Sequence, residues 1–294
     1  MSKKLLFATL CLSLLGGVRA QSTLTTGDTT LPGYDGSRVV ILNSREDGLV
    51  SFLSEDKRYL SGSIGVYGGF VYDLQKDTIL TFEDQMHAYF SPNHYVAAPA
   101  GENMTPFIMI NGTKKELEPS AIGPSASYHN DLSYWSAQPN GKNIVIMGYE
   151  YYTDNRNDTL WGHVGLVYNG EDGTLRAHLR SPWEPSKPFR GNENNLGYGS
   201  RGFSISADGT VVGGHAAWPD PLAFSNTNPS FWDLSALANG GNVKAFGIED
   251  HDFTQSDLHG VNRDGSILVG YNEGTAHGLI IYYDRAKGTF RLDT

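Results

Sequence analysis

The chain has 294 residues, of which 39% are hydrophobic, and its formal net charge is −10 at neutral pH. This acidity, without any run of Lys or Arg, argues against nucleic acid and anionic membrane surfaces as partners, because both attract clustered positive charge. A chain of this length buries roughly three quarters of its surface, so a hydrophobic core is expected to suffice. Disulfides are not expected, since Cys11 is the single cysteine.

Residues 1–20 predict a signal peptide. Lys3 and Lys4 begin it, an apolar run follows over residues 5–15, and residues 18–20 place small side chains where a signal peptidase cleaves. The run is too short to span a bilayer, which takes about twenty residues as a helix, and no later run approaches that length. We therefore expect an exported chain without a membrane span, located in the periplasm, on the cell surface or outside the cell. Cleavage leaves 19 basic and 32 acidic residues, a net charge of −13.

The next segment, residues 21–37, is rich in Thr, Gly, Asp and Ser and predicts a flexible leader. Residues 38–42 predict a strand, which either completes the last unit of a repeat array or belongs to a partial sixth unit. Residues 38–294 are expected to form a single domain. The last predicted strand ends just before Thr294, which leaves open a repeat array that is incomplete at the C-terminus.

A strand–turn–strand phrase recurs five times from residue 52 onward. Its clearest copies are residues 204–213 and 260–270, where apolar or small residues lead into Asp-Gly and a β-branched run leads out. Asp-Gly between apolar runs predicts a tight hairpin whose central residues take positive φ. With the three more degenerate copies included, the turn residue falls at positions 56, 93, 140, 208 and 264.

A second pair of strand-like runs follows each copy of the phrase. The expected strands cover residues 69–74 and 78–82, 106–110 and 114–117, 164–168 and 174–179, 229–234 and 243–246, and 279–283 and 289–292. Helical periodicity is nearly absent, and only residues 235–238 indicate a helical turn. Five units of four short antiparallel strands predict an all-β fold, the β-propeller, in which each unit forms one blade.

The turn phrases resemble two overlapping groups of bacterial propeller repeats. Residues 204–213, with Phe231-Trp232, and residues 260–270 resemble an extracellular repeat that reads Asp/Asn-Gly, Val-Val-Gly and then a Phe-Trp strand. Ser91-Pro92-Asn93 and residues 139–142 resemble the Ser-Pro-Asp-Gly turn of TolB-like repeats. Together the resemblance covers residues 49–293. It implies a propeller fold and export, and it implies no particular activity.

The predicted ligand site lies on one face of the blades. In a four-stranded meander, the loop between strands two and three and the connector to the next blade emerge opposite the Asp-Gly turns. The longest such segments are residues 150–162, 181–200 and 217–228, in blades three and four, and insertions on one face of a repeat array often mark binding. Aromatic rings with Arg and carboxylates suit a sugar or a peptide. The predicted ligand-binding residues are Tyr151, Tyr152, Asp154, Arg156, Trp161, Trp183, Arg190, Tyr198 and Trp218.

Structural roles compete with this interpretation, because a loop aromatic often folds back onto its own blade. Trp135 and Trp232 lie within strand patterns and predict blade packing. Residues 249–252, Glu-Asp-His-Asp, predict a solvated acidic loop rather than a metal site. The other histidines considered are expected to be structural or surface residues: His129, His163, His215 and His259.

No catalytic motif with a nucleophilic elbow, a metal-binding helix or a phosphate-binding loop is present. Propeller glycosidases instead use paired carboxylates about 5 to 10 Å apart in the central funnel, and Asp84, Asp131 and Asp257 precede or begin first strands here. The sequence favours a non-catalytic module, without cofactor or metal, that binds a glycan, a peptide or a cell-envelope partner through the loop face of blades three and four. The alternatives are a carbohydrate-active hydrolase with funnel carboxylates and a structural protein with no ligand.

Overall fold

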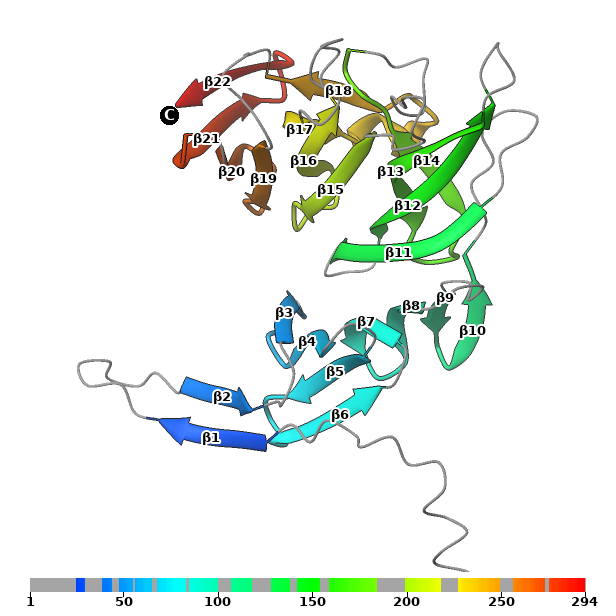
Figure 1. Cartoon of the computed structure of the whole chain (residues 1–294), viewed down its shortest axis with the longest axis vertical. Helices are drawn as coiled ribbons and strands as arrows, with labels where there is room; N and C mark the ends of the chain where they lie inside the picture. The colour runs from blue at the N-terminus through cyan, green and yellow to red at the C-terminus, as the bar shows by residue number, and fades with distance from the viewer. Residues whose placement is uncertain are drawn as a thin grey trace, which may run out of the picture. The chain divides into compact units, whose positions relative to one another are not determined.

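Apart from one short 3₁₀ turn, the regular structure of the described residues is β-strand, in one two-stranded and five four-stranded sheets (Figure 1). The structure, a computed structural model, describes residues 25–29, 39–43, 48–54, 56–64, 68–82, 85–99, 107–117, 128–137, 142–153, 159–183, 199–217, 227–248, 256–272 and 275–293. In some strands only the backbone is described, notably residues 128–137, 146–153 and 159–163.

Each four-stranded sheet is a meander of four consecutive strands. The first two blades contain β3 (Gly48–Leu53), β4 (Tyr59–Ile64), β5 (Gly68–Asp73), β6 (Thr78–Phe82), β7 (Gln85–Ser91), β8 (His94–Pro99), β9 (Phe107–Ile110) and β10 (Thr113–Glu116). The third blade contains β11 (Tyr128–Ala137), β12 (Asn143–Thr153), β13 (Thr159–Asn169) and β14 (Leu175–Leu179). The fourth and fifth contain β15 (Ser200–Ile205), β16 (Val211–Ala217), β17 (Thr227–Asp233), β18 (Lys244–Gly247), β19 (Ser256–Val261), β20 (Ile267–Asn272), β21 (His277–Asp284) and β22 (Thr289–Asp293).

Successive blades pack on one another, since β4 contacts β7, β8 contacts β11, β11 contacts β15 and β16 contacts β19. Five four-stranded antiparallel meanders in succession define an all-β β-propeller, as the repeat predicted. The expected second pair of strands is present in every blade. The helical turn expected over residues 235–238 is the 3₁₀ helix η1 (Ser235–Asn239).

The N-terminal segment contains a sheet of its own. Residues 1–49 form a unit separate from residues 50–294. The strand expected over residues 38–42 is β2 (Val39–Asn43), and it pairs with β1 (Thr25–Thr29) in a two-stranded sheet instead of completing a blade. β1 lies within residues 21–37, which the composition predicted to be a flexible leader. Thr and Gly are tolerated in a strand once a β-branched partner such as β2 supplies the ladder.

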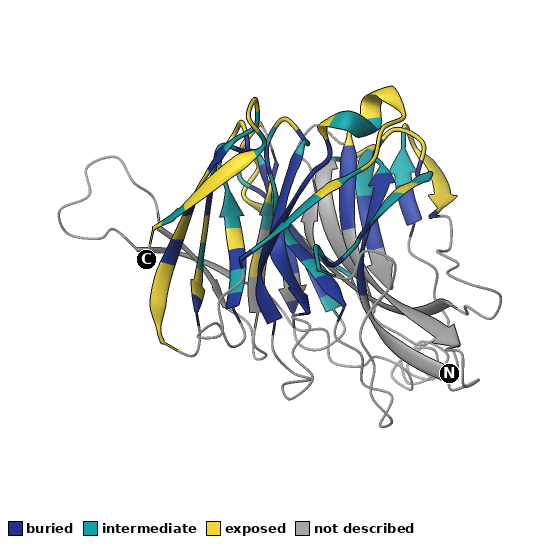
Figure 2. Cartoon of the chain, turned by 90° about the horizontal axis from the view of Figure 1, so that it is seen from above, coloured by how far each residue is buried: buried dark blue, intermediate teal, exposed yellow. Residues whose placement is uncertain are grey.

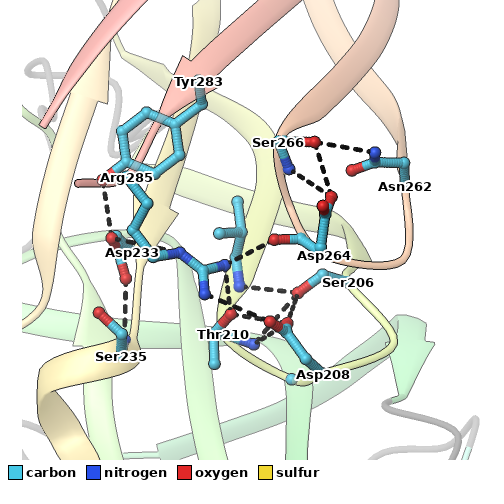
Figure 3. Close-up of polar contacts among 12 residues, drawn as sticks. Ser206, Asp208, Thr210, Asp233, Ser235, Asn262, Asp264, Ser266, Tyr283 and Arg285 are labelled. Carbon is cyan, nitrogen blue, oxygen red and sulfur yellow. Dashed lines mark hydrogen bonds and ion pairs between the residues drawn. The ribbon is translucent and has the colours of Figure 1, made fainter. Parts of the chain in front are cut away.

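The Asp-Gly turns are held by side chains as well as by backbone (Figure 3). In blade four, the Ser206 hydroxyl donates to Asp208 at 2.5 Å, and the Asp208 carboxylate accepts from the Thr210 hydroxyl at 2.6 Å. Only the glycine of the Asp-Gly pair takes positive φ, 74° at Gly209 and 73° at Gly265. The prediction of positive φ at both central residues is therefore wrong, because the Asp carboxylate anchors a longer loop in place of a two-residue turn.

Blade one builds the same turn without glycine. The Ser54 hydroxyl donates to Asp56 at 2.6 Å and accepts from the Arg58 backbone at 3.1 Å, as Ser206 accepts from the Thr210 backbone at 3.1 Å. Lys57 stands in the glycine position with φ 56°. The degenerate copy thus preserves the turn geometry at the cost of a strained lysine.

The core lies between blades and follows the two-residue period of the strands. In β16, Val211 packs toward blade five with Leu258 and Leu268, whereas its neighbour Val212 packs toward blade three with Val145. In β17, Phe231 packs toward blade five and Trp232 packs toward blade three, and both side chains are fully buried. Consequently every residue of β16 and β17 is buried, including Trp232, as the sequence predicted for that residue. Figure 2 shows buried strands gathered in the interior of the sheet array.

Blade five is buried on one face only. Its β21 alternates, with Leu279, Ile281 and Tyr283 buried and the intervening Ile280 and Tyr282 exposed. β22, the strand that ends at the C-terminus in Figure 2, is mostly exposed. The same alternation that makes β17 a two-sided core strand therefore leaves an apolar outer face on the last blade.

Candidate functional site

Most of the predicted ligand residues lie where the structure describes no side chain. Tyr151 and Tyr152 belong to β12 and Trp161 to β13, and their backbones pair, with Tyr151 opposite Trp161. The segment expected as a loop over residues 150–162 is thus largely a long β-hairpin, with β12 reaching Thr153 and β13 beginning at Thr159. Tyr, Thr and Trp residues have high strand propensity, which accounts for the extension. Outside the described residues lie Asp154, Arg156, Arg190, Tyr198 and Trp218.

Trp183 is the one predicted ligand residue whose side chain is described, and it has a packing role. It is partly buried against the cluster between blades three and four. A β-carbon built on Gly247 would lie only 2.3 Å from Trp183 Cζ2, so the indole ring sits directly on β18. The structure therefore gives Trp183 the role of a connector anchor.

The described residues bring a different polar group together near the loop end of blades four and five, meaning the end opposite the Asp-Gly turns. His215 lies near the end of β16, opposite Arg201 of β15. Asp257 lies near the start of β19, opposite Tyr271 of β20. These two pairs occupy equivalent blade positions 56 residues apart. We call His215, Asp257, His259, Phe203 and Tyr271 the histidine cluster.

A carboxylate between two imidazoles forms the polar centre of the histidine cluster. Nδ1 of His215 contacts Oδ1 of Asp257, and Nε2 of His259 lies 3.5 Å from Oδ2 of the same carboxylate. The side chains of His215 and Asp257 are 11% and 16% exposed, whereas that of His259 is 46% exposed. The group therefore has a buried side on blade four and an open side on blade five.

Burial and hydrogen bonding set the charges of this group. Burial lowers the pKa of His215, and its hydrogen bond to Asp257 offsets that effect only in part. Burial acts to raise the pKa of Asp257, but the hydrogen bonds from His215 and His259 outweigh it and hold that pKa well below its usual range. Near neutral pH the centre is thus a carboxylate that accepts from the Nδ1–H group of a neutral, buried imidazole.

Three rings stack beside the carboxylate. His259 stacks on Phe203 with ring centroids 4.9 Å apart and on Tyr271 with centroids 5.2 Å apart. Phe203 also meets His215 edge to face at 5.2 Å. Tyr271 is 39% exposed, so the stack reaches solvent. A flat aromatic surface next to a fixed negative charge can bind a ligand with an apolar face and a hydroxyl or ammonium donor.

The backbone positions the cluster through a bulge at the same place in both blades. The register shifts between Gly202 and Ser204 in blade four and between Leu258 and Gly260 in blade five. Phe203 and His259 are the extra residues in these bulges, and a bulge re-aims its side chain. Opposite lies Gly270, where a β-carbon would stand 1.8 Å from the Asp257 carbonyl oxygen. Glycine at this position permits the close approach that sets Asp257 beside His215.

The geometry bears on the enzymatic alternative. Asp257 is one of the candidate funnel acids, but a carboxyl held ionised cannot serve as the general acid, which needs a raised pKa. In the part of the chain that the structure describes, no group of three or more His, Cys, Asp or Glu converges in a way that could hold a metal ion. Asp84 lies outside the described residues, and Asp131 is described by its backbone in β11 alone.

Sequence reasoning missed His215 and His259 as members of a site. His259 lies two residues after Asp257 in β19, whereas only packing between blades brings His215 of β16 to the same carboxylate. One signal was available: position for position, the repeat places Arg201, Phe203 and His215 in blade four against Asp257, His259 and Tyr271 in blade five. Aromatic and charged side chains at equivalent positions of two neighbouring blades, near the loop end, indicate a surface that the two blades share.

No protein-family profile and no curated protein matches the chain. Solved structures with a similar arrangement include TolB from Acinetobacter baumannii (16% identity, 87% of this chain and 56% of that one, TM-score 0.46). They also include a protein described as TolB from Agrobacterium tumefaciens (13%, 87% and 83%, TM-score 0.47). A third is the Cps50 (Swd1) β-propeller domain from Myceliophteria thermophila (10%, 83% and 72%, TM-score 0.45).

The chain spans little more than half of the Acinetobacter protein. At these identities and TM-scores the similarity concerns the fold, and the strand order and register above establish the fold independently. Within the described residues, no helix combines the length and apolar character required to cross a bilayer.

Proposed function

We propose that the protein is a non-catalytic β-propeller module that binds a glycan, a peptide or a cell-envelope partner at its loop face. The predicted ligand residues of blades three and four, Trp183 excepted, provide one part of this surface, and the histidine cluster extends it to blade five. The observation that carries the proposal is the partly exposed His259 ring, stacked between Phe203 and Tyr271 beside an ionised carboxylate. Rigid rings with one oriented charge supply contact area and orientation together.

The binding test compares variants on a glycan array and in pull-downs from envelope extracts. His259→Ala, Tyr271→Ala and Trp161→Ala should each reduce binding about tenfold or more, since a central aromatic contact is worth more than ~1 kcal/mol. Tyr282→Ala is the matched control, because Tyr282 is a similarly exposed tyrosine on β21, away from the cluster. Equal binding by all the folded variants would refute the loop-face site.

A hydrolase with Asp257 as an ionised nucleophile or base is the second candidate. The fixed charge of Asp257 beside two histidines is the observation that favours it. Turnover of any member of a polysaccharide panel, abolished by Asp257→Asn with the fold retained, would replace the binding module with an enzyme. If neither binding nor turnover is detected, a structural role without a ligand is the better account.

We further infer export to the periplasm, the cell surface or the medium. Residues 1–20, with their basic start and apolar run, support this. Expression of the full chain followed by mass spectrometry of the product should find a mature N-terminus at Gln21. A product that retains Met1 and stays in the cytoplasm would contradict export.

A further inference from the structure

A second cleft lies at the outer edge of blades three and four, away from the histidine cluster. β14 and β18 are the fourth strands of these blades, and each is an edge strand of its sheet. Between them the surface is hollowed to a volume of about 660 Å³. The histidine cluster, in contrast, is built from first and second strands. The cleft is lined by Arg176, Ala177, His178, Arg180, Pro182, Trp232, Leu237, Gly241, Asn242, Val243 and Ala245.

One wall of the cleft is basic. Arg176 and His178 of β14 and Arg180 just beyond its end all line the cleft, and Arg176 is the extra residue of a bulge in the β13–β14 register, which re-aims its side chain. Among the described residues that line the cleft there is no Asp or Glu, although the chain has 32 acidic residues against 22 basic ones. Positive side chains gathered in this way on an acidic protein attract anionic ligands.

The basic groups stand on a rigid support. The Arg176 guanidinium donates to Asn143 Oδ1 at 2.7 Å, and Asn143 in turn donates to the Gly209 carbonyl oxygen of the next blade at 2.8 Å. The Trp232 indole N–H donates to the Arg180 carbonyl oxygen at 2.7 Å. Trp232 is fully buried, so the floor of the cleft is part of the core between the blades. The positive charge of Arg176 is thereby held in place before a ligand arrives, which lowers the entropy lost on binding.

The other wall is apolar. Leu237 of η1 and Val243 and Ala245 around the start of β18 pack against the core between blades three and four while lining the cleft. The edge of β14 that faces away from β13 has no strand partner among the described residues. An extended chain can add to such an edge through main-chain hydrogen bonds and place alternate side chains on either wall.

We propose that this cleft binds an extended acidic peptide, with carboxylates on the Arg176 side and apolar side chains on the Leu237 and Val243 side. Charge complementarity favours an anionic ligand. The apolar wall and the strand edge favour a peptide over a sulfated glycan, which has neither a strand backbone nor alternating apolar groups. This partner surface goes beyond the loop-face function, shares no residue with the histidine cluster and stands or falls separately.

The probe is a fluorescein-labelled six-residue peptide that alternates Glu or Asp with Leu, titrated by fluorescence anisotropy against the full chain. Arg176→Glu should weaken binding about tenfold or more, because reversing a charge beside a bound carboxylate replaces attraction with repulsion. Lys76→Glu makes the same charge change at an exposed position of blade one and should leave the affinity within about twofold. His259→Ala should also leave it unchanged, which separates this cleft from the loop face.

Two further peptides test each wall. Replacing Leu by Ser in the probe should weaken binding by removing contact with Leu237 and Val243, and replacing the acids by Lys should abolish it. Equal loss in Arg176→Glu and Lys76→Glu would show attraction to net charge alone and overturn the proposal. So would the absence of peptide binding at about 1 mM, or binding of a sulfated oligosaccharide that the acidic peptide fails to displace.

Discussion

Lys57 takes a backbone conformation that is usually reserved for glycine, in the turn of blade one. It occupies the left-handed position that glycine fills in blades four and five, and the Ser–Asp hydrogen bond on its N-terminal side is the one that blade four also has. A side chain in this conformation costs roughly 1–2 kcal/mol, which glycine does not incur. The identity of the turn is therefore encoded by Ser54 and Asp56 more than by the glycine.

Lys57→Gly should stabilise the protein by about 1 kcal/mol, after the larger backbone entropy of glycine in the unfolded chain is deducted. Chemical denaturation of the variant and the wild type measures this difference. Lys76→Gly is the control, because Lys76 lies in a turn of the same blade without positive φ. A destabilised Lys57→Gly variant would mean that contacts of the lysine side chain outweigh the backbone strain.

At the scale of the element, a glycine in the second strand of blades four and five lies opposite the bulge of the first strand and lets the two strands approach closely. A β-carbon on Gly214 or on Gly270 would lie 1.8 Å from the carbonyl oxygen of Arg201 or of Asp257. The neighbouring atom is backbone in both cases, so no rotamer change can relieve the overlap. The same structural solution recurs in the two blades that form the histidine cluster.

Gly270→Ala should destabilise the protein by about 3 kcal/mol, because the strand must move away from Asp257. Gly278→Ala, in the same blade, introduces a β-carbon with no atom within 4 Å and should change stability by less than about 1 kcal/mol. Thermal or urea unfolding of the two variants provides the comparison. Equal stability of the two would contradict the close approach at Gly270.

The alternation in β21 makes a second prediction at this scale. Ile281→Lys should cost about 4 kcal/mol or more, since Ile281 is fully buried against blade four and an unpaired charge there has no compensation. Ile280→Lys, one residue earlier, should stay within about 0.5 kcal/mol because Ile280 is 38% exposed. The midpoint of urea unfolding reports both values, and a reversed order would show that the register is shifted by one residue.

At the scale of the whole molecule, ionised carboxylates stabilise the turns of several blades. The Arg58 guanidinium beside Asp73 lowers the pKa of that carboxyl to about 2. Hydrogen bonds from hydroxyl and backbone groups hold the pKa of Asp56 and Asp264 below the usual value, and they do so for Asp208 against the opposing effect of burial. A lowered carboxyl pKa contributes stability above the unfolded value near 3.8, and this stability is lost as the pH falls.

The thermal midpoint should accordingly be nearly level from pH 7 to pH 5 on account of these groups and fall steeply between pH 4 and pH 2. Asp73→Asn should unfold at a lower temperature than the wild type at pH 7, whereas the two should converge toward pH 2, where Asp73 is increasingly protonated in the wild type. Circular dichroism melts across this range measure the convergence. A constant gap between the two proteins would show that the charge of Asp73 does not stabilise the fold.

Much of the fold was predictable because strand periodicity and turn chemistry act locally. Asp208-Gly209 and Asp264-Gly265 marked their turns, and the runs on either side form the strands expected. The extended hairpin of β12 and β13 was missed, since a Tyr-rich segment can be a loop or a strand until a partner strand is known. The pairing of β1 with β2 was missed for the same reason.

The sequence by itself determined the all-β class, the five-unit repeat and the side chains that close its turns, because each depends on residues within a few positions of one another. Tertiary structure alone decided that His215 meets Asp257, that Trp183 packs on β18, and that Arg176 and Leu237 face each other across a cleft. These partners lie in different strands and mostly in different blades. Their approach depends on how one sheet packs on the next, which local periodicity does not specify.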